Sequence, residues 1–288
     1  MNKENNMNEN KKQEYGMNYL NKKILVFDLE VAPYDFENDY SEEEKQYLTK
    51  FAKNDEEMKA AVENLVFTPF TSQLVAIGML QMEFRKPEKE ISAKSFEDLK
   101  NQLDDSGQEY ELKQIMGCVL INTGENGNEN SEIKPERENV KYITSDEKTL
   151  IENFWNYISK NKYNLFITFN GREFDCPYIM LRSMIHNVKP SYNLMRGNDF
   201  NIKDYHVDLM KEMTFNKHSP TGARRKFSLD WYCKKLGIES PKSHGVTGDM
   251  VGEMFRQKKF KEIADYCYED VIATGNLFEK WNKILNIK

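Results

Sequence analysis

Lys23-Ile24-Leu25-Val26-Phe27-Asp28-Leu29-Glu30-Val31 is the segment around which the fold is expected to form. Its first half is a nearly continuous run of apolar strand formers, which is typical of a strand covered on both faces. The run ends on two acids, and side chains at positions i and i+2 of a strand share a face. Two such carboxylates repel each other unless a cation lies between them. Alone, the segment is also compatible with a strand that runs out into solvent, so a site requires further acids elsewhere.

The composition indicates a globular protein. The chain has 288 residues, of which 39% are hydrophobic and 31% charged, and this length can hold one large domain or two small ones. The formal net charge of -6 argues against a protein that coats nucleic acid through bulk positive charge. It does not exclude a protein that holds the end of a strand with bound metal ions.

The cysteines and the apolar runs indicate a cytoplasmic location. Cys118, Cys176, Cys233 and Cys267 form no C-x-x-C pair, so neither a zinc site nor a disulfide framework is predicted, and reduced thiols are expected. Residues 1–15 lack the apolar core of a signal peptide. No apolar run approaches the length of a membrane span, so no membrane partner is expected.

Several segments are expected to lie outside the main sheet. Residues 1–20, rich in Asn, Lys and Glu, are predicted to be a disordered tail. Insertions are expected at about 35–70 and 85–140. Within the first, residues 41–65 have the pattern of exposed amphipathic helix, in two short pieces. Within the second, residues 122–138 are polar and predict a long hairpin tip or a flexible insertion.

Strands and helices alternate in the rest of the chain, as judged from apolar runs and apolar residues at helical spacing. Strands are expected at residues 72–82, 116–121, 140–143, 164–169 and 205–210, and helices at 145–160, 173–186, 228–237, 249–257 and 260–281. Ser145 or Asp146 and Ser228 are natural N-caps, and Gly237 is a fitting C′ residue. This order predicts a single α/β domain with a mixed central β-sheet flanked by helices.

Three short segments carry the residues that are expected to form a site. They are Asp28-Leu29-Glu30, Asn170-Gly171-Arg172-Glu173-Phe174-Asp175-Cys176-Pro177 and Tyr266-Cys267-Tyr268-Glu269-Asp270. Tyr266 and Asp270 are four residues apart in a predicted helix and therefore share a face. Asp28 and Glu30 leave a strand end and Asp175 begins a helix. Four carboxylates and a phenol could then meet at one edge of the sheet.

These oxygen donors favour a hard divalent cation. Carboxylates suit Mg²⁺ or Mn²⁺ rather than zinc. Two such ions, roughly 3.5 to 4 Å apart, clamp the attacking and leaving oxygens of a phosphodiester. Tyr266, with an ordinary pKa of about 10, is a poor general base at neutral pH and is expected to hold the attacking water in line.

The three segments resemble the exonuclease motifs of the DEDD 3′-5′ exonuclease superfamily, in its tyrosine-bearing branch. The closest resemblance is to the predicted exonucleases related to the proofreading domain of family B DNA polymerases. It extends over about residues 22–281 and includes Phe154-Trp155, His206-Val207-Asp208-Leu209-Met210, Ser228-Leu229-Asp230 and Leu236-Gly237-Ile238. It implies a ribonuclease-H-like fold and hydrolysis of nucleotides from a 3′ end by a two-metal-ion mechanism, with Mg²⁺ or Mn²⁺ as cofactors.

The resemblance also implies roles for single residues. Asp28, Glu30 and Asp270 would bind the metal that activates water. Asp28 would also reach the second metal, which Asp175 would support. Glu30 would sit near the terminal 3′-hydroxyl, and Tyr266 completes the catalytic set. Contacts with the substrate are expected from Leu29, Asn170, Arg172 and Phe174.

The expected substrate is the 3′ end of single-stranded nucleic acid, DNA before RNA, with DNA repair as the context. An RNA 3′-end trimmer of the same fold stays open, because no segment recognisably reads the 2′-hydroxyl. A catalytically silent nucleic-acid-binding module is a further alternative, which the loss of one acid would have favoured. No polymerase domain follows in this sequence, so proofreading within the same chain is not expected, and no protein partner is predicted.

Some of these residues also have ordinary structural explanations. His206 and Asp208 share a strand face and could bind metal, but a structural pair in which Asp208 bonds nearby backbone is favoured. The basic run 224–226 could contact phosphates or form a solvated loop, equally well. Tyr266 could be a core aromatic residue with a satisfied hydroxyl, and Phe174 could belong to the core instead of stacking on a base.

Overall fold

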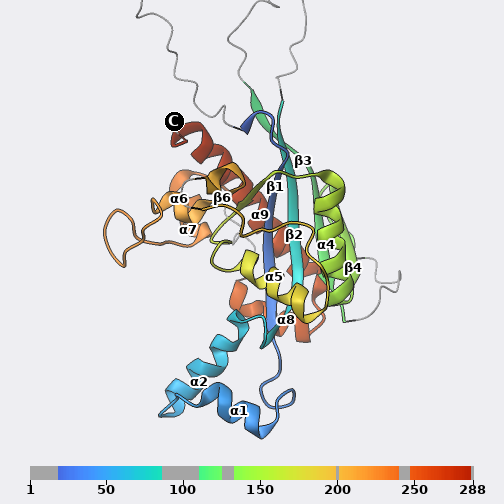
Figure 1. Cartoon of the computed structure of the whole chain (residues 1–288), viewed down its shortest axis with the longest axis vertical. Coiled ribbons are helices and arrows are strands. Elements are labelled where there is room, and N and C mark those ends of the chain that lie inside the picture. Colours follow the sequence, from blue (N-terminus) through green and yellow to red (C-terminus); the bar gives the residue numbers. More distant parts are fainter. Residues whose placement is uncertain (1–18, 86–109, 125–132, 199–200, 240–246, 287–288) are drawn as a thin grey trace, which may run out of the picture.

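A six-stranded mixed sheet with helices on both faces forms the centre of the protein (Figure 1). The computed structural model describes residues 19–85, 110–124, 133–198, 201–239 and 247–286. The strands are β1 Ile24–Pro33, β2 Ser72–Arg85, β3 Glu111–Asn122, β4 Val140–Ser145, β5 Leu165–Thr168 and β6 His206–Asp208. The α-helices are α1 Glu42–Thr49, α2 Asp55–Glu63, α4 Glu147–Asn161, α5 Asp175–Ile185, α6 Leu209–Met213, α7 Leu229–Leu236, α8 Val251–Arg256 and α9 Phe260–Ile284, with 3₁₀ turns η2 Asn64–Phe67, η3 Ile202–Asp204 and η5 Gly248–Met250.

The strand order confirms the expected fold class. The sheet runs β4-β3-β2-β1-β5-β6, and β2 is antiparallel to both of its neighbours while β1 and β5, β5 and β6, and β3 and β4 pair in parallel. Five strands in the order β3-β2-β1-β5-β6 with only β2 reversed give the ribonuclease-H-like arrangement. β4 extends this sheet by one strand beyond β3.

The central strand β1 is buried on both faces, which explains its continuous apolar run. Leu25 and Phe27 pack into the core that faces α4 and α5. Ile24 and Val26 pack into the core that faces α9. Because side chains alternate between faces along a strand, Asp28 and Glu30 face α9 as well.

Close packing of α9 on β2 sets the depth at which this helix crosses the sheet. Gly78 of β2 is paired with Asp28 of β1 in the register. A Cβ atom on Gly78 would lie 2.7 Å from Val271 Cγ2 and 2.9 Å from the backbone oxygen of Cys267, which is closer than atoms normally approach. Glycine at this position therefore lets the motif-bearing part of α9 reach the end of β1.

Two sequence-based expectations about local structure need correction. Of the two alternatives expected for residues 122–138, the hairpin tip is wrong, because β3 and β4 are parallel and a hairpin joins antiparallel strands. The other alternative, a flexible insertion, stays a prediction. Residues 125–132 lie outside the described residues. The strand expected at 205–210 ends at Asp208, because the Asp208 side chain accepts bonds from the N–H groups of Met210 and Lys211 and caps α6.

Parts of the segments that were expected to lie outside the sheet belong to the core or to the sheet itself. Of the predicted tail, residues 1–18 lie outside the described residues, while Tyr19 is buried with its ring 6.0 Å from that of Phe278. The first expected insertion contains α1, α2 and η2. Part of the second, Glu111–Asn122, is the sheet strand β3, and residues 86–109 lie outside the described residues. Within the described ranges, every helix is too short or too polar to cross a lipid bilayer.

Candidate active site

Two acids leave β1 toward α9 and meet a thiol there. One carboxylate oxygen of Asp28, one of Glu30 and the Sγ atom of Cys267 all lie within 4.8 Å of one another. Glu30 is buried, with 7% of its surface exposed, and Asp28 is half-buried. The thiol lies 3.8 Å from the backbone oxygen of Asp28. The i, i+2 spacing thus places the two acids together, whereas no spacing rule pointed to Cys267.

Asp175, the first residue of α5, is tied directly to the same strand. Its side chain is buried, and its Oδ1 atom accepts a hydrogen bond of 3.0 Å from the backbone N–H of Leu29. Leu29 itself packs into the core on the opposite face. The bond therefore fixes the Asp175 carboxylate beside Leu29, between Asp28 and Glu30. Leu29 contributes its backbone N–H to this cluster of acids, while its side chain lies in the core.

Tyr266 and Asp270 complete the group from α9. The Tyr266 hydroxyl donates a hydrogen bond to the Asp270 carboxylate, as their spacing of one helical turn allows. Tyr266 is buried and Asp270 is half-buried. The charges of Asp28, Glu30 and Asp270 all act on the phenol. The five residues expected to be catalytic thus lie together, and "the acid site" below means Asp28, Glu30, Asp175, Tyr266 and Asp270.

The acids raise one another's pKa values. Burial is the largest cause that raises the pKa of Asp28, and the neighbouring carboxylates raise it further. Burial likewise raises the pKa of Glu30, followed by the charges of Asp270 and Asp175. The pKa of Asp175 rises to about 7 through burial, although the backbone N–H groups that donate to it oppose the shift. The charges that raise the pKa values of Asp28 and Glu30 are those of the neighbouring carboxylates.

The donor set of this group fits a divalent cation. Buried carboxylates whose neighbours are carboxylates can be neutralised by a proton or by a bound cation. Their oxygens are the hard ligands that Mg²⁺ and Mn²⁺ prefer. Burial raises the pKa of the Cys267 thiol far above its ordinary value, so the sulfur is held as a neutral thiol rather than as a thiolate ligand.

The turn before α5 is held in place by hydrogen bonds to the Asp208 carboxylate. The backbone N–H groups of Asn170 and Arg172 donate to the two oxygens of the Asp208 carboxylate at 3.0 and 2.9 Å. Asn170 has a positive φ of 66°, and a Cβ atom on Gly171 would clash with the Thr168 side chain. The Asn-Gly pair is therefore needed for the chain to turn tightly enough to aim Asp175 at β1.

His206 and Asp208 have the structural roles that were favoured for them. His206 is 2% exposed, and its Nε2 atom lies 2.8 Å from Thr168 Oγ1. Burial lowers the pKa of His206 to about 3, and the charge of Arg172 adds to this, so the ring is neutral. The Asp208 carboxylate oxygens accept hydrogen bonds from backbone N–H groups of the turn and of α6.

Two of the residues expected to bind substrate have contacts within the protein. The Arg172 guanidinium donates to the backbone oxygens of Leu194, Met195 and Arg196, so a contact with a phosphate would require these bonds to be exchanged. Phe174 is partly buried against the α4/α5 core, and its ring lies 6.4 Å from the ring of Phe67, which is 63% exposed. Phe174 therefore belongs to the core on one side and to an exposed aromatic pair on the other.

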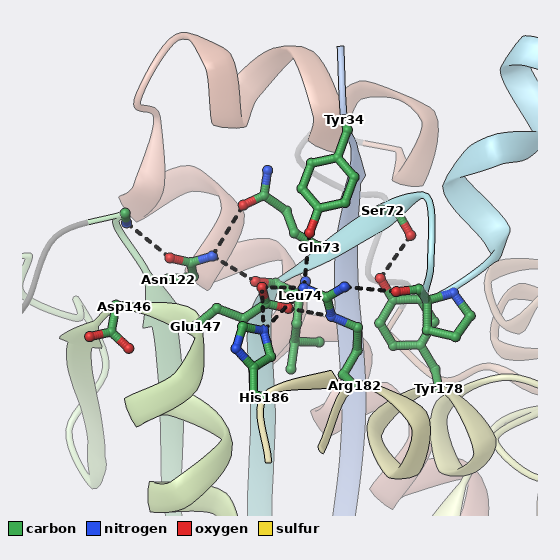
Figure 2. A network of polar contacts seen from close by, with 12 residues as sticks. Tyr34, Ser72, Gln73, Leu74, Asn122, Asp146, Glu147, Tyr178, Arg182 and His186 are labelled. Atoms are coloured by element: carbon green, nitrogen blue, oxygen red, sulfur yellow. Dashed lines mark hydrogen bonds and ion pairs between the residues drawn. The ribbon is translucent and has the colours of Figure 1, made fainter. Parts of the chain in front are cut away.

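A second buried carboxylate, Glu147 of α4, was missed by the sequence analysis (Figure 2). Its Oε1 atom accepts bonds of 2.7 Å from Arg182 Nε and from the backbone N–H of Leu74. Its Oε2 atom lies 2.5 Å from Arg182 Nη2 and 3.0 Å from His186 Nε2. Arg182 also donates to the backbone oxygen of Pro69 at 2.7 Å. "The Glu147 network" below means Glu147, Arg182 and His186.

The Glu147 network joins segments that are far apart in the chain. Arg182 Nη2 lies 3.0 Å from the Tyr34 hydroxyl at the end of β1, and Arg182 is 2% exposed. Its position, three residues after Ile179 and four after Tyr178, places it on the buried face of α5. That spacing is the signal from which the buried arginine could have been inferred.

Comparison with known proteins gives one family and many similar solved structures, among them a family B DNA polymerase. The sequence model of a family described as predicted 3′-5′ exonuclease related to the exonuclease domain of PolB matches residues 109–285. This span holds Asp175, Tyr266 and Asp270, while Asp28 and Glu30 precede it. No curated protein matches the chain. The family B DNA polymerase from the hyperthermophilic archaeon Pyrobaculum calidifontis is similar in structure, with 14% sequence identity and a TM-score of 0.46, over 90% of this chain and 24% of the polymerase. The chain thus spans about a quarter of that polymerase.

Proposed function

We propose a substrate and a mechanism for this chain from the premise that it belongs to the family of predicted 3′-5′ exonucleases related to the exonuclease domain of PolB. It removes nucleotides one at a time from the 3′ end of single-stranded nucleic acid, DNA before RNA, with Mg²⁺ or Mn²⁺. The observation that carries the proposal is the convergence of Asp28, Glu30, Asp175 and Asp270 at the end of β1, where the neighbouring carboxylates raise the pKa values of Asp28 and Glu30.

The four acids of the acid site are the proposed metal ligands. Two divalent ions held there would lower the pKa of an attacking water and neutralise charge on the phosphate as its ester bond breaks. Asp175 contributes through a carboxylate already oriented by the Leu29 N–H. Glu30 lies beside Asp28 on β1 and is proposed to face the terminal 3′-hydroxyl of the strand.

Tyr266 is proposed to position the reacting groups and not to act as a base. Burial, followed by the charge of Asp270, raises the pKa of Tyr266 far above its ordinary value. The hydroxyl therefore keeps its proton at neutral pH and acts as a hydrogen-bond donor. It donates this hydrogen bond to Asp270, which orients the phenol toward the acid site. The hydroxyl oxygen can accept a hydrogen bond from the attacking water and hold it in line with the scissile phosphate.

Substrate contacts are proposed at the turn before α5. Asn170 and the backbone of Leu29 lie next to the acids and would position the terminal nucleotide. Phe174 and the exposed Phe67 offer an aromatic surface on which its base could stack. Arg172 would reach a phosphate only after release of the carbonyls that it now binds.

The decisive experiment is a time course of 5′-labelled single-stranded DNA and RNA with the purified protein and millimolar Mn²⁺. We expect a ladder of DNA products that shortens by one nucleotide at a time from the 3′ end, more slowly or not at all with RNA. Asp175→Ala serves as the control for contaminating nuclease and should leave the strand intact. Faster shortening of RNA would change the substrate to RNA. If the unmodified protein leaves both the DNA and the RNA intact, the remaining hypothesis is a catalytically silent binding module.

A further inference from the structure

A basic and aromatic surface extends along the loop before α7 and along α7 itself. Residues 213–227 carry Lys217, Arg224, Arg225 and Lys226 and no Asp or Glu, although the chain has a formal net charge of -6. Residues 224–226 are exposed. Among the described residues, none of these three side chains forms an ion pair with a carboxylate. Their positive charge is therefore available to a partner.

Aromatic rings alternate with cations along this surface. The Arg225 guanidinium lies 5.1 Å from the centre of the Phe227 ring. Phe227 stacks on Trp231 with centroids 5.7 Å apart and planes at 18°. Lys235 Nζ lies 4.9 Å from the centre of the Trp231 ring, which is 45% exposed. "The Trp231 surface" below means Arg225, Lys226, Phe227, Trp231 and Lys235.

The Trp231 surface is continuous with the acid site through α7 and the loop before it. The ring of Tyr232, next to Trp231, lies 6.0 Å from Phe169, which directly precedes the Asn170 turn. Cys233 on the inner side of α7 is buried, and the charge of Asp270 acts on it. Figure 1 shows α7 close to α6 and β6, and Leu229 of α7 packs into the same core as Val207 and Leu209.

Helix α6, which leads into the basic loop, contacts the turn that carries Asp175. Lys211 forms an ion pair of 2.6 Å with Glu173, two residues before Asp175. The basic loop joins α6 to α7. A strand that leaves the acid site past Glu173 and Lys211 would therefore meet this loop and then α7.

We propose that the Trp231 surface binds the single strand on the 5′ side of its terminal nucleotide, with bases on Phe227 and Trp231 and phosphates at Arg225 and Lys226. The proposal rests on the proposed function. Surfaces that hold single strands without reading sequence combine cations for the backbone with aromatic rings for the bases. The acid site by itself repels a polyanion, so an adjacent cationic surface is what retains the strand between successive cleavages.

Binding without cleavage tests the surface directly. The probe is a fluorescent oligothymidylate of about 12 nucleotides, within the site sizes of about 4 to 16 nucleotides known for single-strand binding folds, measured by anisotropy in EDTA. Trp231→Ala should weaken binding about tenfold, the scale of one lost base stack. Trp231→Phe should retain most of the affinity, whereas Trp231→Leu, which keeps the apolar surface without a ring, should lose it.

The cations are tested by salt dependence. Each phosphate contact to a single strand contributes about 0.7 to the slope of log affinity against log salt, so Arg225→Ala with Lys226→Ala should lower the slope by about 1.4. Because Arg225 and Lys226 lie on an exposed loop, their replacement is not expected to unfold the protein. The salt dependence therefore tests the surface even if the Trp231 variants do not fold. The matched control is Lys148→Ala with Lys160→Ala, two exposed lysines on α4. An equal loss in this control, or unchanged affinity in the surface variants, would overturn the proposal.

Kinetics separate the surface from the acid site. The p-nitrophenyl ester of thymidine 5′-monophosphate has a scissile phosphate but no strand on its 5′ side, which is the part proposed to bind the Trp231 surface. The surface variants should lower kcat/KM for the oligonucleotide about tenfold and leave that for the ester unchanged. An equal loss on both substrates would overturn the surface. If the unmodified protein cleaves neither substrate, the proposed function fails, and the anisotropy results alone decide whether the surface binds nucleic acid.

Discussion

Glu147 and the acid site both contain buried carboxylates, but their surroundings among the described residues differ: basic side chains contact Glu147, whereas carboxylates surround Asp28 and Glu30. Glu147 receives two hydrogen bonds from Arg182, one from the Leu74 N–H and a contact from His186. Asp28 and Glu30 are acted on by other carboxylates among the described residues. The charge of Glu147 is thus balanced within the chain, whereas Asp28 and Glu30 are expected to take up protons or a cation.

This difference assigns different purposes to the two groups. A buried ion pair costs free energy of desolvation and is a weak source of net stability, but removing one partner leaves an uncompensated charge. The bonds of Arg182 to Pro69 and Tyr34 indicate that the Glu147 network fixes the position of chain segments. Acids that raise one another's pKa are instead typical of functional sites. The comparison therefore predicts opposite effects on stability when a charge is removed from each group.

The largest effect is expected on catalysis, in Asp28→Asn. Loss of several kcal/mol of metal-assisted stabilisation of the transition state corresponds to a rate lower by on the order of 10⁴-fold. The same change removes a repelling charge, so the free energy of unfolding in EDTA should stay equal or increase. The rate of 3′ shortening and chemical denaturation in EDTA measure the two quantities. A variant that loses activity because it has become less stable would contradict the assignment.

Arg182→Ala should have the opposite signature. It leaves Glu147 buried without its main partner, and breaking a buried pair in this way costs about 3 to 5 kcal/mol of folding stability. Because Arg182 does not contact the acid site, the rate per folded molecule should change much less than in Asp28→Asn. Urea denaturation measures the loss.

The matched control removes both charges together. Glu147→Leu combined with Arg182→Met replaces the ion pair by apolar side chains and should recover much of the stability lost in Arg182→Ala. If the double variant is as unstable as the sum of the two single variants, then the charges are not coupled as the structure indicates.

A smaller effect, of a few kcal/mol, is expected in the pH dependence of stability without metal. The pKa of Asp175 is about 7 in the folded protein, and about 4 is ordinary for an unfolded chain. Between these values the folded state binds more protons, so stability is lost as pH rises, by about 1 kcal/mol per pH unit. His206 opposes this trend because its pKa is lowered to about 3. The quantity to measure is therefore the difference between the unmodified protein and Asp175→Asn, in which the His206 contribution cancels.

In this difference, Asp175→Asn should gain stability relative to the unmodified protein from about pH 4 to about pH 7. Asparagine can still accept the bond from Leu29, so the position of α5 is kept. A difference that is constant across this range would mean that Asp175 is already ionised at low pH in the folded protein.

The sequence was sufficient for those features that depend on local spacing. The double burial of β1 follows from its unbroken apolar run, and the shared face of Asp28 and Glu30 follows from strand alternation. The Asn170 turn and the Ser228 cap are local as well. The grouping of Asp28 with Asp175 and Asp270 was inferred from the predicted strand end, helix start and helix face that carry them. The resemblance of the three motifs to a known family supported this inference, since neither periodicity nor charge relates segments so far apart.

Features set by long-range packing could not be predicted. The parallel pairing of β3 and β4 depends on the path of the chain between them, which leaves no periodic signal. Arg182 meets Glu147 across 35 positions of sequence. Cys267 enters the acid site because Gly78 lets α9 pack close to β2. In each case, which two segments lie in contact is determined by the tertiary structure.

The smallest effect is expected from adding metal. An ion that binds only the folded state stabilises it by about 2.7 kcal/mol when its concentration is 100 times its dissociation constant. Mn²⁺ or Mg²⁺ should therefore raise the Tm of the unmodified protein, and Asp28→Asn, with one ligand removed, should respond less. Arg182→Ala is the informative comparison, because its lower starting Tm should rise by as much as that of the unmodified protein. If Asp28→Asn responds as strongly as the other two proteins, the stabilising ion binds outside the acid site, and the contrast between the two buried groups no longer supports a metal-dependent mechanism.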